Sequence, residues 1–371
     1  MRTVDLIGYI ENWAPPGAAW ERDNIGLQVG SSKTDLKNVL LALEVNEAVV
    51  KEALKKKCNF ILTHHPFIFN KLSRINTAGA KGKIIALLIK NDITLYSAHT
   101  NLDFTEGGVS FRLAEKLGLK NLRYLANEKG NQFKVAVFLP ENDLEKVSNA
   151  IFQAGGGIIG NYSHCSYRAK GNGTFRGGQN SNPAIGEKEK FETVEEIKLE
   201  ALVYSWKLND VLSAVRKAHS YEEPAVDVYP LENENVNYGY GVVGELDPQE
   251  NINAFLLKIS KKLNTTALKY CKGKTAKIKT VAVCGGSGAD LIPAAIGAGA
   301  DAYVTADIKY HTFQDAENKI YLIDAGHYET EVVVLDEVKK RLEKFVKENN
   351  GKIEIYKFKG STNPVKIFNL K

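Results

Sequence analysis

The sequence predicts an α/β fold, with two α/β halves that form one domain and a smaller α+β module inserted between them. Three observations support this prediction. Strand-like runs alternate with helix-like stretches at both ends of the chain, these runs are apolar throughout, and the middle of the chain has a different, antiparallel-looking pattern. Strands that are apolar throughout belong to sheets covered on both faces. We expect the two halves at 1–128 and 249–371, and the inserted module at 129–248.

Both halves are predicted to consist of βαβ units, in which buried strands alternate with helices. In the N-terminal half the strands are Val39–Val45, Asn59–Thr63 and Ile93–Ala98, and the helices are Glu47–Lys57, Lys81–Asn91 and Gly108–Leu117. In the C-terminal half the strands are Ile278–Cys284, Asp301–Thr305, Ile320–Asp324 and Lys352–Phe358, and the helices are Ala289–Ala298 and His327–Glu348.

The inserted module is predicted to be ferredoxin-like, because its elements follow the order β-α-β and then β-α-β. Its strands are Lys134–Leu139, Glu195–Tyr204 and Val226–Leu231, and its helices are Asn142–Ala154 and Lys207–His219. The polar, glycine-rich stretch Asn161–Gly186 is expected to be a long central loop.

Composition excludes several classes of function. The chain has 371 residues, of which 44% are hydrophobic and 25% charged, as in an ordinary soluble globular protein. Its net charge of +5 is small and its basic residues are spread out, so a nucleic-acid partner is not expected. No apolar run reaches the ~20 residues of a membrane span, the N-terminus is unlike a secretory signal, and the four cysteines form no CxxC pair. We expect a cytoplasmic protein without a membrane partner.

Imidazoles and carboxylates follow four of the predicted strands, at the point where each strand ends. His64 and His65 follow the strand at 59–63, His99 and Asp103 that at 93–98, Asp307 and His311 that at 301–305, and His327 and Glu331 that at 320–324. Open α/β sheets bind ligands in the crevice outside the carboxyl ends of their strands. We therefore expect these side chains to meet at one edge of one sheet.

Each motif also has a purely structural interpretation. The pair His64-His65 reaches one centre only if the chain turns there, which the following proline favours. His327 and Glu331 share a helix face, but such a pair also forms simple surface contacts. Asp103 could cap a helix or a turn. His99 could orient a ligand or be an ordinary buried histidine.

Taken together, the donors indicate a metal site. Three imidazoles and two carboxylates form the mixed ligand set expected for Zn, Fe, Mn or Co, and five ligands exceed the four of a closed structural zinc site. With Asp103 or Glu331 as a bridging ligand, they suit two ions about 3.5–4 Å apart. Water held between two cations loses a proton near neutral pH and becomes a nucleophile. The ligands are His64, His65, Asp103, His327 and Glu331.

The turn Gly285-Gly286-Ser287-Gly288 has two interpretations. Its backbone amides could hold a phosphate at the N-terminus of the next helix, or its glycines could serve a tight turn that needs their dihedral angles. Lys309 and Arg74 are further candidates for binding phosphate, by position only.

Five motifs resemble the GTP cyclohydrolase I type 2 family, also called the NIF-three-like proteins. They cover both outer segments, about two thirds of the chain, and occur in the family's order: Asp23–Gly30, Leu62–Phe69, Ser97–Asp103, Asp307–His311 and Ile323–Glu331. The resemblance implies that both halves form one NIF-three-like domain. Three motifs of the inserted module resemble the trimeric PII/CutA-like module of longer family members: Gly171–Arg176, Asn182–Gly186 and His219–Ala225.

The resemblance implies two divalent metal ions per subunit (Zn, Fe or Mn), with the same five ligands. It places His99 and His311 near the metals, as candidates for catalysis. It also implies a homohexamer, a toroidal trimer of dimers whose sites face an inner cavity. Two positions depart from the family's pattern, Ala306 in place of a glycine and Glu44 in place of an aspartate. Neither change removes a metal ligand, so only the shape of the pocket is affected.

The family's name implies a reaction, the hydrolytic opening of the imidazole ring of GTP to formate and dihydroneopterin triphosphate. His99 or His311 could transfer protons in it. A second hypothesis is a metal-dependent phosphoesterase or amidohydrolase that acts on another small molecule or nucleotide. A third is a non-enzymatic, metal-responsive regulatory or adaptor protein that senses through the inserted module. There, His219 and Glu222-Glu223 could bind a ligand or stabilise contacts between subunits.

Overall fold

The structure of the protein is a computed structural model that describes residues 1–368, and its contacts divide the chain into two compact units. Unit 1 comprises residues 1–126 and the chain from residue 238 onward, and unit 2 comprises residues 127–237. The chain therefore leaves unit 1 once and returns to it once. The return falls just before β10 (Gly239–Asn251), eleven residues ahead of the position taken from the sequence. No helix among residues 1–368 is long and apolar enough to cross a bilayer.

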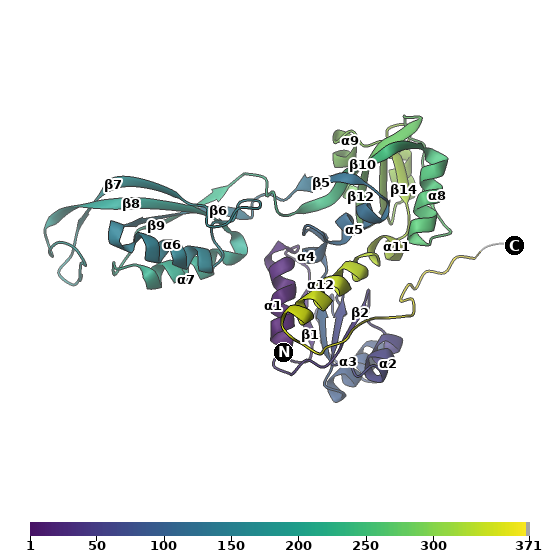
Figure 1. Ribbon diagram of the computed structural model, residues 1–371, viewed down its shortest axis with the longest axis horizontal. Helices are drawn as coiled ribbons and strands as arrows, with labels where there is room; N and C mark the ends of the chain where they lie inside the picture. The colour runs from purple at the N-terminus through teal and green to yellow at the C-terminus, as the bar shows by residue number, and fades with distance from the viewer. Residues whose placement is uncertain (369–371) are drawn as a thin grey trace. The chain divides into compact units, whose positions relative to one another are not determined.

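The first sheet of unit 1 has the strand order β1-β4-β3-β2-β15; Figure 1 labels two of its strands, β1 and β2. Strands β2, β3, β4 and β15 run parallel, and β1 is antiparallel to β4. Every residue of β2, β3 and β4 is buried, as expected for a sheet with both faces covered. The strands are β1 (Gly26–Val29), β2 (Val39–Ala42), β3 (Phe60–Thr63), β4 (Thr94–Ser97) and β15 (Ile355–Lys357).

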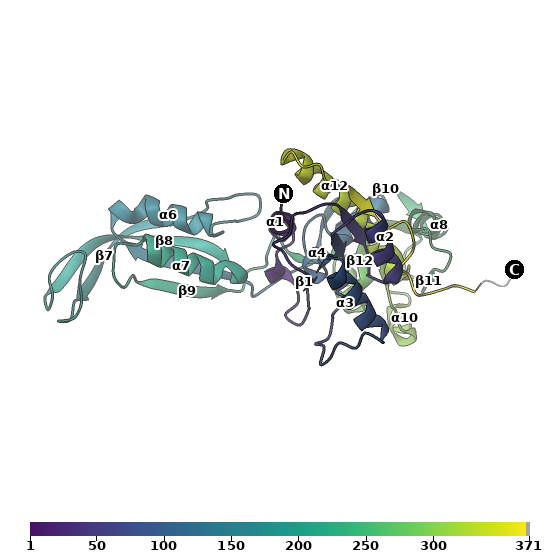
Figure 2. The same cartoon turned by 90° about the horizontal axis from the view of Figure 1, so that it is seen from below.

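Helices cover both faces of this sheet (Figures 1 and 2). On one face, Leu6 and Ile10 of α1 and Val338 of α12 share a core with Phe60 of β3. On the other face, α2 and α3 bury Val49 and other apolar side chains against the sheet. The helices are α1 (Thr3–Trp13), α2 (Glu47–Lys55), α3 (Ala80–Lys90) and α12 (Val334–Glu348).

The second sheet of unit 1 has the order β11-β14-β13-β12-β10-β5. Strands β12, β13 and β14 run parallel, while β10 and β11 are antiparallel to their neighbours β12 and β14. The remaining strands are β5 (Lys120–Asn127), β11 (Lys269–Tyr270), β12 (Lys277–Ser287), β13 (Ala302–Ala306) and β14 (Tyr321–Asp324). The fold of unit 1 is therefore mixed α/β with more than one sheet, which confirms the predicted class.

Helices also pack on this second sheet. Phe111 of α5 and Phe255 of α8 lie in one core with the sheet, whereas α9 and α10 contribute Ala295 and Ala316 to another. Two short helices, α4 and α11, begin just after β4 and β14 and carry candidate ligands. The helices are α4 (Thr100–Asp103), α5 (Val109–Lys116), α8 (Ile252–Leu263), α9 (Ile292–Gly297), α10 (Tyr310–Ala316) and α11 (His327–Glu331).

Unit 2 is a four-stranded antiparallel sheet with the order β7-β8-β6-β9. Helices α6 and α7 pack on one face, where Val147, Ile151, Val211 and Val215 meet Leu199 of β8. The elements are β6 (Gln132–Leu139), α6 (Leu144–Gln153), β7 (Tyr167–Arg176), β8 (Phe191–Tyr204), α7 (Leu208–Ala218) and β9 (Val226–Leu231).

Three predicted elements differ from the structure: a loop, a helix and a turn. The stretch 161–186 is not all loop, because β7 pairs with β8 over ten residues. Its glycines have low strand propensity, but pairing with β8 outweighs that propensity. The helix predicted at 327–348 is two helices, α11 and α12. The turn predicted at 285–288 is largely strand, because β12 continues to Ser287 through an irregularity in its register with β13.

Candidate metal centre

The first two candidate ligands come directly after β3. His64 is 2% exposed, and its Nδ1 donates to the carbonyl oxygen of Ala98 at 2.9 Å, so its Nε2 carries the lone pair. The Nδ1 atom of His65 lies 3.0 Å from Oε1 of Glu44. The chain bends at these two residues, while the His65 amide donates to the carbonyl of Leu43, 2.9 Å away. The two neighbouring rings, with centroids 5.0 Å apart, can therefore serve one centre.

His99 and Asp103 follow β4, at the two ends of the short helix α4. Asp23, from the loop before β1, contacts Nδ1 of His99 at 2.8 Å and accepts from the Thr100 hydroxyl at 2.5 Å. Burial opposes the charge of Asp23, but these hydrogen bonds outweigh it and lower the pKa of Asp23 to about 2. Asp23 is therefore a carboxylate that fixes the tautomer and the orientation of the His99 ring.

His327 and Glu331 lie four residues apart on α11, so they share one face of the helix. The helix begins after Gly326, whose φ of +92° favours glycine. Nε2 of His327 is 3.1 Å from Oε1 of Glu331. Nδ1 of His327 is 2.6 Å from Oδ2 of Asp307, which directly follows β13.

The five candidate ligands meet around the carboxylate of Glu331, which is 3% exposed. Besides its contact with His327, Oε1 of Glu331 lies 3.9 Å from Nε2 of His64, and Oε2 lies 2.9 Å from Nε2 of His65. Nε2 of His64 is in turn 3.5 Å from Oδ1 of Asp103. The His99 ring lies beside them, 5.2 Å and 5.4 Å from the rings of His64 and His65.

The donors come from two sheets, and the expectation of a single sheet edge was wrong. Strands β3 and β4 belong to the five-stranded sheet, whereas β13 and β14 belong to the six-stranded one. The carboxyl ends of strands from both sheets meet within unit 1. Apolar strands that alternate with helices have the same sequence pattern whether or not they share a sheet, so the pattern could not distinguish the two arrangements.

The chemistry of this cluster fits a divalent cation. Two buried atoms, Nε2 of His64 and Oδ1 of Asp103, lack a hydrogen-bond partner among residues 1–368. A buried polar atom without a partner costs about 1–3 kcal/mol, so a further group is needed there. Two sets of ligand atoms, each within 4.8 Å of one another, are available: His64, His65 and His99, and His65, His327 and Glu331. Mixed nitrogen and oxygen donors suit Zn, Fe or Mn.

The protonation states within the cluster also fit a divalent cation. Burial lowers the pKa of His64 to about 3, which keeps this imidazole neutral with a free lone pair. Burial, reinforced by Glu331, raises the pKa of Asp103 well above its ordinary value. Burial opposes protonation of His65, but hydrogen bonds to two carboxylates outweigh it and raise the pKa of His65 to about 10. The hydrogen bond to Glu331 also raises the pKa of His327 to about 9. In the metal-free protein, protons on His65 and His327 therefore balance the negative charge of Glu331. A bound cation would balance that charge in their place.

Gly286 leaves space at the centre that a side chain would fill. It lies at the end of β12 with a φ of +63°. A Cβ atom added there would lie 2.1 Å from Oε1 of Glu331 and 3.3 Å from Nε2 of His327. The glycine therefore keeps open the volume in front of two candidate ligands.

The glycine segment does not favour a phosphate cradle, because the amides of its three glycines are already bonded within the fold. The amide of Gly285 donates to the hydroxyl of Ser110 (3.3 Å), that of Gly286 to Thr330 (3.0 Å), and that of Gly288 to Thr305 (3.0 Å). Of the two interpretations taken from the sequence, the structure favours the second at Gly286, whose φ of +63° needs a glycine.

The other sequence candidates lie at the surface. His311 on α10 is exposed, and its contacts are with Gln314, 3.4 Å away, and the ring of Tyr310. Lys309 and Arg74 are exposed as well. The cluster described above thus contains the five proposed ligands and His99, whereas the contacts of His311 are with its own neighbours on α10.

Sequence reasoning did not assign the role of the carboxylates that hold the imidazoles. Asp23, Glu44 and Asp307 each contact the Nδ1 atom of one histidine, namely His99, His65 and His327. A signal was present, since each acid lies in a motif or next to a strand end. The pairing itself joins segments 20 to 76 residues apart.

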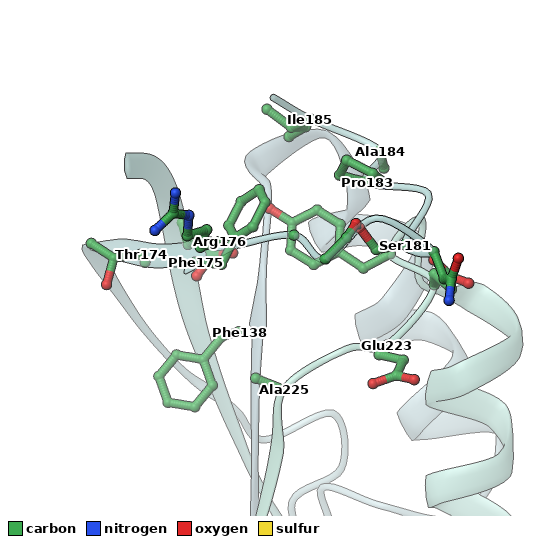
Figure 3. A pocket seen from close by; sticks show the side chains of 17 residues that line it. Phe138, Thr174, Phe175, Arg176, Ser181, Pro183, Ala184, Ile185, Glu223 and Ala225 are labelled. Carbon is green, nitrogen blue, oxygen red and sulfur yellow. The ribbon is translucent and has the colours of Figure 1, made fainter. Parts of the chain in front are cut away.

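Unit 2 contains a separate cavity of about 740 Å³ (Figure 3). Its walls come from the end of β6, the end of β7 with the following loop, and the segment before β9. Phe138, Phe175 and Tyr221 contribute aromatic surface, while Glu223 and Arg176 contribute charge. Its size is that of a small-molecule site.

Comparison with known proteins places the chain in a family. The family model for Duf34/NIF3 (NGG1p interacting factor 3) matches residues 1–364. A protein of Halalkalibacterium halodurans named GTP cyclohydrolase 1 type 2 homolog is 38% identical over 361 residues, 97% of each chain. A Bacillus subtilis protein of the same name is 36% identical, over 97% of this chain and 96% of its own length.

Solved structures agree with these relatives. A Bacillus cereus protein described as related to NIF3 matches with a TM-score of 0.83 and 38% identity, over 99% of both chains. A Staphylococcus aureus protein matches with a TM-score of 0.79 and 30% identity, again over 99% of both chains. The fold of the whole described chain is thus shared with proteins of similar length.

Proposed function

This chain belongs to the Duf34/NIF3 family, and we propose that it holds two divalent metal ions and acts as a metal-dependent hydrolase. The proposed ligands are His64, His65, Asp103, His327 and Glu331. One observation carries the proposal: these imidazoles and carboxylates converge from the ends of β3, β4 and β14, and two of their buried atoms, Nε2 of His64 and Oδ1 of Asp103, lack a partner among residues 1–368. The metal is Zn, Fe or Mn, which all accept these donors.

The residues of the chain have separate roles in this proposal. Bound divalent cations supply Lewis acidity, which activates water and polarises the bond to be broken. His99 moves the proton, because Asp23 holds its Nδ1 and its Nε2 remains available beside the cluster. His311, exposed on α10 four residues after Asp307, is the second candidate for proton transfer. Gly286 leaves the space in front of Glu331 that a substrate or water needs.

For the reaction, we propose the hydrolysis of GTP to formate and dihydroneopterin triphosphate. Two observations support this choice: the relatives that cover nearly the whole chain are named GTP cyclohydrolase 1 type 2 homologs, and the site combines ligands for cations with a histidine placed for proton transfer.

The test is metal analysis of protein purified without chelator, followed by an assay of formate release from GTP. We expect two metal ions per chain and formate in proportion to the metal content. The variants His64→Ala and Glu331→Ala should lose both. Full metal content in these variants would contradict the ligand assignment. Two metals with phosphate release and no formate would instead support a phosphoesterase.

A second candidate function is that of a metal-responsive regulator, and the cavity of unit 2 favours it. A regulator of this kind would bind a small molecule at a second site, apart from its metal centre. The cavity of about 740 Å³ is large enough for such a molecule. This candidate predicts bound metal with no turnover of any nucleotide tested. We rank it second because no catalytic role is then left for His99.

We further propose the arrangement of the assembly. Unit 2 has the element order β-α-β-β-α-β, which supports a ferredoxin-like module of the PII/CutA-like kind. Through it and unit 1 the chain forms a homohexamer, a toroidal trimer of dimers. Light scattering should give a mass of about six times the 41.0 kDa of one chain; a mass of 41 kDa would contradict this. The four free thiols suit the reducing cytoplasm, which we propose as its compartment.

A further inference from the structure

We infer that residues 358–365, called here the C-terminal strap, belong to the candidate metal centre, and that Thr362 is a positioning residue for the ligand His65. The inference rests on the proposed metal site. It adds to that site a segment in which none of the recognised motifs lies.

The strap reaches the centre because of the strand that precedes it. β15 runs parallel to β2 at the edge of the five-stranded sheet. The amide of Phe358 continues this pairing by donating to the carbonyl of Leu41, 2.9 Å away. The chain is thereby led past the carboxyl end of β2, where Glu44 follows two residues after the strand.

The first contact of the strap acts on His65 through Glu44. The hydroxyl of Thr362 donates to Oε2 of Glu44, while Oε1 of Glu44 lies 3.0 Å from Nδ1 of His65. The Glu44 side chain is 32% exposed, so packing alone does not hold it. With both oxygens bonded, the carboxylate has one orientation and holds Nε2 of His65 toward the 2.9 Å contact with Glu331.

The second contact acts on the helix that carries the other ligands. Nδ2 of Asn363 donates to Oε1 of Glu329 at 2.9 Å. Glu329 lies on α11 between His327 and Glu331, and its other oxygen lies next to Gly326, where the helix begins. Two consecutive strap residues thus contact a neighbour of each group of ligands, Glu44 beside His65 and Glu329 beside His327 and Glu331.

The strap has its own local order. The amide of Asn363 donates to the hydroxyl of Ser361 at 3.2 Å, and Oδ1 of Asn363 accepts from the amide of Val365 at 2.9 Å. Such side-chain turns are typical of Asn and Ser. Thr362 and Asn363 are half-buried, whereas their neighbours on both sides are exposed. The two residues that contact Glu44 and Glu329 are therefore the ones that the local turns direct away from solvent.

The test compares three variants of the full chain loaded with Co²⁺: Thr362→Val, which keeps the shape but loses the hydroxyl, Thr362→Ser, which keeps the hydroxyl, and Thr77→Val, an exposed threonine of the same unit. The readouts are the Co²⁺ dissociation constant from chelator competition and the visible absorption spectrum of the bound ion. Removing a direct partner of a ligand costs about 10–100-fold in affinity. Thr362 acts one bond further away, so we expect Thr362→Val to weaken binding about 3–10-fold and to change the spectrum.

Thr362→Ser should restore both readouts, and Thr77→Val should leave them unchanged. A Thr362→Val variant with unchanged affinity and spectrum would overturn the role of the strap alone. Failure of the parent protein to bind Co²⁺ would overturn the proposed metal site, and this inference with it. The two failures are thus distinguishable.

A chain ending at Lys359 tests the strap as a whole, because it removes both contacts and leaves β15 intact. We expect about a 10–100-fold loss of Co²⁺ affinity, with the melting temperature of the metal-free protein close to that of the parent. A shortened chain that binds Co²⁺ as tightly as the parent would contradict the inference. This result does not depend on whether the Thr362→Val variant folds.

Discussion

At the scale of residues, the centre depends on how each imidazole is held through Nδ1. A backbone carbonyl holds His64, and the carboxylates of Glu44, Asp23 and Asp307 hold His65, His99 and His327. In every case Nε2 is the atom left for the centre. Partners of this kind set the tautomer and the basicity of a metal-ligating histidine, so they belong to the site as much as the ligands do.

Glu331 should be the most sensitive single ligand, because its two oxygens contact three imidazoles. We expect Glu331→Gln to lower the amount of bound metal at least about tenfold at a fixed free concentration, measured by elemental analysis after dialysis. The matched control is Glu348→Gln, at the exposed end of α12 in a surface pair with Lys344. Equal metal content in the two variants would refute the central position of Glu331.

Gly286 should tolerate no side chain. Alanine there would meet Oε1 of Glu331 and would have to adopt a φ of +63°, which costs about 1–2 kcal/mol. We expect Gly286→Ala to lose that much free energy of unfolding and most of its bound metal. Gly297→Ala, in α9 with no atom within 4 Å of the new Cβ, is the control. It should be neutral or gain about 0.4–1 kcal/mol. Denaturant titration separates the two results.

At the scale of elements, the site depends on the junction between α11 and β12. Thr330, fully buried on α11, accepts from the amide of Gly286 at 3.0 Å and donates to the carbonyl of Gly326 at 2.9 Å. One hydroxyl therefore ties the start of the ligand-bearing helix to the strand that borders the centre. The parallel strands supply the other ligands from their ends, as in other open sheets.

This junction can be tested without metal. Thr330→Val keeps the volume of the side chain but leaves the Gly286 amide without this acceptor in the interior. We expect a loss of about 1–3 kcal/mol in the free energy of unfolding of the metal-free protein, from urea denaturation. Thr330→Ser, which keeps the hydroxyl, should lose less. If serine proves as damaging as valine, the hydrogen bonds are not what joins α11 to β12.

At the scale of the whole molecule, all candidate ligands and their partners lie in unit 1, and the cavity of about 740 Å³ lies in unit 2. Metal binding should therefore stabilise one unit directly. A ligand that binds only the folded state adds about 2.7 kcal/mol at 100 times its dissociation constant.

Hydrogen exchange with and without Zn²⁺ tests this division. We expect slower exchange near residues 64–65, 99–103, 285–288 and 326–331 in the presence of the metal. Residues 127–237 should exchange at the same rate in both states. Protection by Zn²⁺ that is confined to unit 2 would contradict the location of the metal site in unit 1.

The residues that form the cluster could be named from the amino-acid pattern. His64, His65, Asp103, His327 and Glu331 were identified because each follows an apolar strand, and the ends of strands are readable from a local pattern. The family was also recognisable from five motifs in its order, and the match over residues 1–364 confirmed it. Neither inference required knowledge of how distant segments pack.

How these residues are held follows from the packing of distant segments and could not be predicted from local patterns. That the donors come from two sheets, that Asp23, Glu44 and Asp307 orient the imidazoles, and that Thr362 reaches Glu44 all depend on segments 20 to 318 residues apart. The physical reason is that strand formation follows local periodicity, whereas a side-chain hydrogen bond forms only where packing of the complete core brings its two atoms to about 3 Å.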